Sequence, residues 1–205
     1  GAKASDDPLV AALRESRAGV VTLVAKSHPL HVEMALRTTL AENLAMVHDS
    51  VTHLRAEGQR VFLDAEHFFD GYAADPAYAL EVLRTAVEAG ADVAVLCDTN
   101  GGRLPDEVAD VVHAVRAATS ARLGIHCHND AGCAVANSLV AVRMGVTQVQ
   151  GTINGYGERT GNADLITAIP DLSLKMGVRT IERERLQLLT SVAHHIAEVV
   201  NISPA

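Results

Sequence analysis

The chain has 205 residues, of which 48% are apolar and 20% charged, and its formal net charge is −8. This length is sufficient for one domain with an apolar core. The acidic balance excludes the basic surface that nucleic acids and anionic membranes require, and no apolar stretch approaches the ~18 residues of a membrane span. The three cysteines (Cys97, Cys127 and Cys133) are odd in number and lack zinc-finger spacing, which favours reduced thiols and a cytoplasmic location.

Short β-rich runs alternate with longer helical patterns along the chain. Strands are predicted at 19–25, 60–65, 92–97, 122–128 and 148–153, and helices at 33–57, 76–89, 105–118, 132–144, 162–175 and 183–200. The helix at 33–57 rests on leucines and valines that recur at three- and four-residue spacing. Five strand–helix units in succession predict parallel pairing with right-handed crossovers.

Residues able to do chemistry follow nearly every predicted strand: Lys26, Glu66, His67, Asp98, Thr99, His126, His128 and Asn154. The carboxyl ends of the strands form the active face of a (β/α)8 barrel, whereas a doubly wound sheet gathers such residues at one switch point. We therefore predict an α/β fold of the barrel type. Because a closed barrel has eight strands and about 250 residues, residues 1–205 are expected to form a single catalytic-barrel segment, the later five strand–helix units, with three strands before Gly1.

The segment His126-Cys127-His128-Asn129-Asp130 ends the fourth predicted strand. Residues two apart in a strand point to the same face, so His126 and His128 present two imidazoles to one side. Two imidazoles can hold a divalent metal when further ligands complete the shell. Two histidines can equally be ordinary polar residues at the end of a strand.

A second segment, residues 151–162, holds four glycines and follows the last predicted strand. This density of glycine indicates a backbone that turns sharply and approaches something closely. Asn162, at its end, is expected either to cap the next helix or to offer its amide oxygen to a metal shell begun by the two histidines. A flexible loop is the alternative.

Together, H-C-H-N-D at 126–130, G-x-G-E-R-x-G-N at 155–162 and L-C-D-T-N-G-G at 96–102 resemble the Claisen-condensing metal enzymes. This group contains 2-isopropylmalate, homocitrate and citramalate synthases, with 3-hydroxy-3-methylglutaryl-CoA lyases as relatives. The segments 42–46, 64–71 and 149–157 look most like the citramalate synthase branch. The resemblance covers essentially the whole chain.

The resemblance implies an acyltransferase that condenses acetyl-CoA with a 2-oxo acid such as pyruvate and then hydrolyses the thioester. A divalent metal (Zn, Mn, Mg or Co) polarises the ketone while a base removes a methyl proton from acetyl-CoA. The matching positions imply metal contacts from His126, His128 and Asn162, an acid–base role for Glu66, and contact with the 2-oxo acid for Thr99. A homodimer is implied for the full-length protein.

The sequence suggests roles for several other polar residues, and for most of them it leaves two interpretations open. Arg159 is expected either to meet a substrate carboxylate or to form a structural ion pair, and Glu66 could instead pair with Arg159. Asp98 is expected to position Thr99 or to pair with Lys26. Asp130 is expected to orient an imidazole, as groups behind metal ligands commonly do.

The chain departs from the family in three places. It has no D-x-T-L-R-D-G-type motif, which carries an aspartate ligand and an arginine in the family, and it stops at 204–205, about where the family's histidine-bearing linker begins. His28-Pro29 stands where the citramalate branch has Trp-Asp. We therefore expect no turnover by the chain alone. The alternatives are a truncated non-catalytic fragment, a related metal-dependent lyase, and a metal-dependent hydrolase or aldolase barrel.

Overall fold

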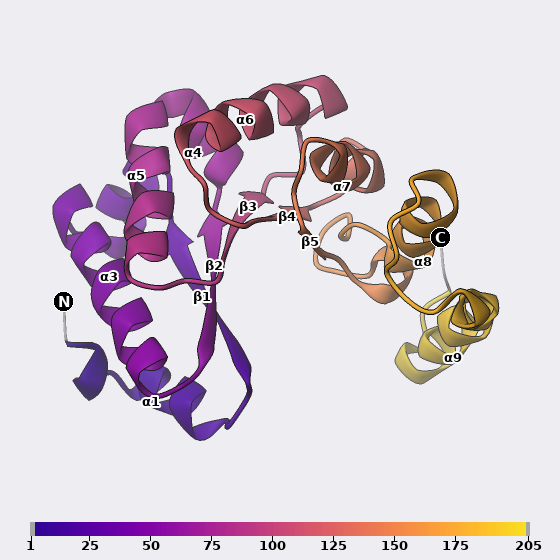
Figure 1. Ribbon diagram of the computed structural model, residues 1–205, viewed down its shortest axis with the longest axis horizontal. Coiled ribbons are helices and arrows are strands. Elements are labelled where there is room, and N and C mark those ends of the chain that lie inside the picture. Colours follow the sequence, from indigo (N-terminus) through magenta and orange to yellow (C-terminus); the bar gives the residue numbers. More distant parts are fainter. Residues whose placement is uncertain (1–2, 204–205) are drawn as a thin grey trace.

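The computed structural model describes residues 3–203, and a five-stranded parallel sheet lies at its centre (Figure 1). The strands are β1 (Val20–Lys26), β2 (Arg60–Glu66), β3 (Val93–Asp98), β4 (Leu123–Cys127) and β5 (Gln148–Gln150), and they pair in chain order. Each of the five predicted strands is therefore present, and the last is shorter than expected. The parallel pairing predicted from the alternation of strands and helices is confirmed.

The helices follow the strands and cover one side of the sheet. They are α1 (Pro8–Glu15), α2 (Pro29–His31), α3 (Leu40–Ala56), α4 (Phe68–Ala74), α5 (Pro76–Glu88), α6 (Pro105–Ala118), α7 (Ala134–Arg143), α8 (Leu165–Pro170) and α9 (Leu189–Val200). Short 3-10 turns lie at Ala4–Asp6, Ile153–Gly155 and Arg183–Leu188, and π turns at Val32–Leu36 and Asp171–Lys175. Figure 1 shows α3, α5, α6 and α7 in succession around the outer side of the sheet, with α8 and α9 beyond β5.

Two predicted helices are wrong at their starts. The helix expected at 33–57 is broken, because Arg37 takes a left-handed conformation (φ 53°) and the Thr39 side chain caps α3 by accepting from the Glu42 backbone N–H at 3.1 Å. The helix expected from 162 begins at Leu165, capped by Asp164. Asn162 instead forms a β-bridge with His128, so its expected role as a helix cap is wrong.

Alternation along the strands separates two faces. On the outer face, buried residues of the three central strands pack against the helices: Val61, Leu63, Ala65, Ala94, Leu96, Leu123, Ile125 and Cys127. On the inner face, Phe62 packs with Val93, Val95 and Cys97, and of these Cys97 lies near the carboxyl end of β3. Polar side chains occupy the same inner face toward the carboxyl ends. The inner face therefore changes from apolar to polar along the strands, and the polar end is the place for a site.

Among the described residues the sheet is not closed, since β1 and β5 are edge strands, and its inner face is exposed at β1. The edge strand β1 pairs only with β2 there, and Val20 and Val24 are 38% and 64% exposed. None of the helices within 3–203 has the length and apolar character needed to cross a membrane.

Candidate active site

A cavity of about 180 Å³ lies at the carboxyl ends of the strands. Its lining residues are Val24, Asp64, Glu66, Cys97, Thr99, His126, His128 and Glu158. Four residues predicted from the sequence, Glu66, Thr99, His126 and His128, are thus brought together from β2, β3 and β4. Parallel strands place their carboxyl ends at one edge of the sheet, which is why residues far apart in the sequence meet there.

The two histidines lie side by side on the inner face. Their ring centroids are 5.0 Å apart and the ring planes are inclined by 70°. Burial lowers the pKa of His126, and the neighbouring His128 lowers it further. Within residues 3–203, neither buried Nδ1 atom has a hydrogen-bond partner. Imidazoles with buried, unpartnered Nδ1 atoms fit two positions of a divalent-metal shell.

The described side chains do not complete that shell. Glu158 Oε1 lies 3.6 Å from His128 Nδ1, but no group of three or more His, Cys, Asp or Glu side chains in the described part of the chain is arranged to hold a metal. Asn162 is adjacent to His128 through the β-bridge, yet it lines a second cavity of about 570 Å³. There its Nδ2 donates to the Tyr156 carbonyl at 3.0 Å, which leaves the amide oxygen outside that contact.

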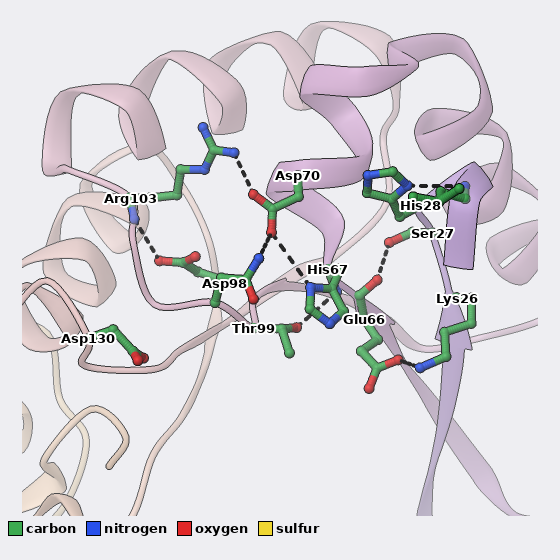
Figure 2. Close-up of polar contacts among 12 residues, drawn as sticks. Lys26, Ser27, His28, Glu66, His67, Asp70, Asp98, Thr99, Arg103 and Asp130 are labelled. Carbon is green, nitrogen blue, oxygen red and sulfur yellow. Dashed lines mark hydrogen bonds and ion pairs between the residues drawn. The ribbon is translucent and has the colours of Figure 1, made fainter. Parts of the chain in front are cut away.

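Glu66 is held by two residues at the carboxyl end of β1, Lys26 and Ser27. Its carboxylate forms an ion pair with Lys26, and Ser27 Oγ donates to the Glu66 carbonyl at 2.6 Å (Figure 2). The alternative of a Glu66–Arg159 pair is therefore wrong, because the cross-strand register places Lys26 opposite Glu66. The Asp98–Lys26 pair is wrong for the same reason.

Thr99 connects β3 to the start of α4. Its Oγ1 accepts from the His67 backbone N–H at 2.8 Å, so the loop after β2 is tied to the loop after β3. Asp98 is 1% exposed and accepts from the Arg103 backbone N–H at 3.2 Å. Burial raises the pKa of Asp98, and the hydrogen bond from Arg103 opposes that rise.

A polar network surrounds these loops (Figure 2). Asp70 on α4 accepts from Arg103 Nη2 at 2.7 Å and from Asn100 Nδ2 at 2.6 Å, and it lies 3.6 Å from His67 Nδ1. His31 lies between His28, with which it stacks at 4.6 Å, and His67, which it meets edge-on at 4.4 Å. The carboxyl ends of β1, β2 and β3 are thus joined by side chains as well as by the sheet.

Arg159 joins three loops. Its Nε and Nη2 donate to the two carboxylate oxygens of Asp130, each at 2.9 Å, and Nη2 also donates to the Thr99 carbonyl at 2.8 Å. The hydrogen bond from Arg159 lowers the pKa of Asp130 to about 2. Asp130 therefore holds Arg159, and the expectation that it orients an imidazole is wrong. Gly101 (φ 63°) is required here, since a Cβ on it would lie 2.4 Å from Asp130 Oδ2.

Sequence reasoning missed three titratable lining residues: Asp64, Cys97 and Glu158. Asp64 Oδ1 accepts from Gln150 Nε2 at 2.9 Å, beside the cavity. Burial raises the pKa of Asp64 and, well above its ordinary value, that of the Cys97 thiol. Strand alternation was the signal for Asp64 and Cys97, because they lie two residues before Glu66 and Thr99. Glu158 lies in a loop, where no such period applies.

The chain is similar to known proteins in sequence and in fold. The family described as HMGL-like matches residues 2–196. The (R)-citramalate synthase of Streptomyces coelicolor is 60% identical over 205 residues, covering 100% of this chain and 38% of that protein. That of Synechocystis sp. is 51% identical over 206 residues, covering 97% and 38%. In structure, the HMG-CoA lyase of Bacillus subtilis matches with a TM-score of 0.80 at 21% identity, covering 95% of this chain and 68% of that chain.

The coverage differs between the two kinds of comparison. The chain spans 38% of the length of the two synthases. The lyase structure shows the fold, and it confirms the prediction of an α/β chain that forms five successive strand–helix units of a barrel.

Proposed function

Because this chain belongs to the HMGL-like family, we propose that it forms part of the catalytic barrel of a cytoplasmic, acetyl-CoA-dependent acyltransferase. The reaction is condensation of acetyl-CoA with a 2-oxo acid such as pyruvate, followed by thioester hydrolysis. One observation carries the proposal: Glu66, Thr99 and two imidazoles with unpartnered Nδ1 atoms meet in one cavity. The chain is also 60% identical, over its whole length, to a segment that makes up 38% of an (R)-citramalate synthase.

The HMGL-like family implies a divalent metal and acetyl-CoA. We assign the metal, one of Zn, Mn, Mg or Co, to His126 and His128, with Asn162 as a third contact through its amide oxygen. When bound, such a metal supplies Lewis-acid polarisation of the keto group.

The chain's own residues divide the other tasks. Glu66 Oε2 faces Lys26, so Oε1 is the oxygen left to take a proton from the methyl group of acetyl-CoA. Thr99 Oγ1 accepts from His67 and retains its own proton to donate to the 2-oxo acid. Nη1 of Arg159 takes no part in the contacts to Asp130 and Thr99, and we assign it to the substrate carboxylate.

A hybrid enzyme tests the proposal. This chain replaces the matching segment of the Streptomyces coelicolor synthase, and release of CoA thiol is followed with pyruvate and with bulkier 2-oxo acids. We expect condensation that is lost in the His126→Ala/His128→Ala variant and retained in His113→Ala, an exposed histidine on α6. The 205-residue chain alone is expected to be inactive, and the hybrid is expected to sediment as a homodimer.

Two outcomes reject the proposal. A folded hybrid that condenses no 2-oxo acid, although the parent synthase does, identifies the chain as a non-catalytic fragment. A hybrid that cleaves 3-hydroxy-3-methylglutaryl-CoA and does not condense identifies a lyase. Calorimetry with divalent metal on the same variants shows whether the two histidines bind it.

A further inference from the structure

Lys26 and Glu66 face each other at the ends of neighbouring strands. They are partners in the parallel register of β1 and β2, and their side chains form an ion pair. The next residue strengthens the junction, because the backbone N–H and Oγ of Ser27 both reach the Glu66 carbonyl, at 3.3 and 2.6 Å. The ion pair is therefore anchored at both backbones.

The backbone of Lys26 is held from behind as well. Asn43 on α3 is 3% exposed, and its Nδ2 donates to the Lys26 carbonyl at 3.0 Å. The same amide group contacts the Tyr78 hydroxyl at 2.8 Å. The Lys26 backbone is already fixed by these contacts. Holding the Lys26 side chain in one geometry therefore costs less conformational entropy than it would on a mobile surface segment.

The cavity around Glu66 contains several carboxyl groups, and Lys26 is a cation that contacts one of them. Asp64, Glu66 and Glu158 place three carboxyl groups on one small cavity. The other side chains of that cavity are uncharged or imidazole: Val24, Cys97, Thr99, His126 and His128. Nearby, burial lowers the pKa of His31, as do His67 and His28, so its imidazole is neutral near pH 7. Arg159 and Arg103 are paired with Asp130 and Asp70.

Among the described residues, Lys26 is thus the cation that contacts a carboxylate of the cavity. Its side chain is 26% exposed and that of Glu66 is 27% exposed. Partial burial reduces solvent screening of the pair, which strengthens the attraction between its two charges. Without Lys26, the Glu66 carboxylate would lose its contact with a cation and would share the cavity with the carboxyl groups of Asp64 and Glu158.

We propose that Lys26 is a positioning residue that holds Glu66 as an oriented carboxylate with Oε1 free to accept a proton. This inference rests on the proposed function. The C–H electron pair of the acetyl-CoA methyl group becomes that of the enolate while the proton passes to Glu66 Oε1. Lys26 Nζ keeps its proton throughout. Its positive charge then stands beside a neutral carboxylic acid and favours the negative charge that has formed nearby.

The test uses the hybrid enzyme with Lys26→Met, Lys26→Gln and Lys26→Arg. Lys175→Met, an exposed lysine distant in sequence, is the matched control. Two quantities are measured: kcat as a function of pH, and exchange of the acetyl-CoA methyl hydrogens with deuterated solvent. We expect Met and Gln to lower both by about tenfold or more, on the scale of a general base, with little change in KM for the 2-oxo acid.

The Arg variant keeps a positive charge and should retain kcat within about threefold, since it conserves the charge that orients Glu66. If Met and Gln lower only the melting temperature and leave exchange and kcat unchanged, Lys26 is structural and the proposal is overturned. An unmodified hybrid that does not condense rejects the proposed function. An active hybrid that is indifferent to Lys26 rejects only the role of Lys26.

Discussion

Gln150 on β5 donates a hydrogen bond from Nε2 to Asp64 Oδ1 on β2, at 2.9 Å, although β3 and β4 lie between these two strands. Neighbouring strands are about 4.8 Å apart, so side chains three strands away meet only when the sheet is strongly curved. The contact therefore shows that five strands already form a concave inner face. The curvature is that of a barrel wall, and it brings the carboxylates of β2 toward the histidines of β4.

Asp64→Asn is expected to gain stability relative to the wild type as pH rises. Burial raises the pKa of Asp64 above its ordinary value, so its contribution to stability is complete below the unfolded pKa and is lost as pH rises through the folded pKa. Asparagine keeps an oxygen for Gln150 and has no charge to bury. Urea unfolding at pH 4 and pH 7 measures the difference, and an equal difference at both values would contradict the prediction.

Gly71→Ala is expected to destabilise the protein by about 1–3 kcal/mol. A Cβ on Gly71 would lie 2.3 Å from the Ser27 carbonyl oxygen and 3.0 Å from His28 Cα, which are backbone atoms and cannot rotate away. This clash exceeds the gain of about 1 kcal/mol that alanine brings to a helix. Thermal unfolding provides the measurement. Gly19→Ala is the control, because no described atom lies within 4 Å of its Cβ, and a control that is equally destabilised would refute the steric account.

Asn43→Ala is expected to lower the free energy of unfolding by about 1–3 kcal/mol, because it leaves two groups without their buried donor. These groups are the Lys26 carbonyl and the Tyr78 hydroxyl. Tyr78→Phe removes one member of the network and should cost about 1 kcal/mol. Chemical denaturation of the two variants and of their combination measures both effects, and a Phe variant as unstable as the Ala variant would argue against this assignment.

Asp130 is expected to titrate near pH 2 and to depend on Arg159. Its pKa of about 2 comes first from the hydrogen bond that Arg159 donates. The folded pKa is depressed, so the stabilisation from this pair is present above the unfolded pKa and is lost as pH falls through the folded pKa. Carbon NMR of the Asp130 carboxyl group should show its midpoint rising toward 3.8 in Arg159→Ala. Arg159→Lys keeps the positive charge but cannot donate two parallel hydrogen bonds, so the Asp130 midpoint should lie between those of the wild type and Arg159→Ala. If the Asp130 midpoint does not change in either variant, the Arg159–Asp130 pair is excluded.

Local sequence patterns predicted the elements that depend on few residues. The five strands and the helix at 105–118 follow from apolar runs and from a proline in the first turn. The break before α3 was missed because Arg37 adopts a left-handed backbone conformation that its residue type does not predict. The start of α8 was missed because Asn162 and Asp164 are both good caps in sequence, and the β-bridge to His128 decides between them.

The sequence by itself determined that Glu66, Thr99, His126 and His128 share one end of a parallel sheet. Alternation along each strand indicates the face of the sheet on which a side chain lies, and parallel pairing places the carboxyl ends of all the strands at one edge. Only the tertiary structure decided the pairs: Lys26 with Glu66, Asp130 with Arg159, and Asp64 with Gln150. Such pairs depend on the register between strands, the curvature of the sheet and the path of the glycine-rich loop. These are properties of the whole packed chain, so no local pattern of residues encodes them.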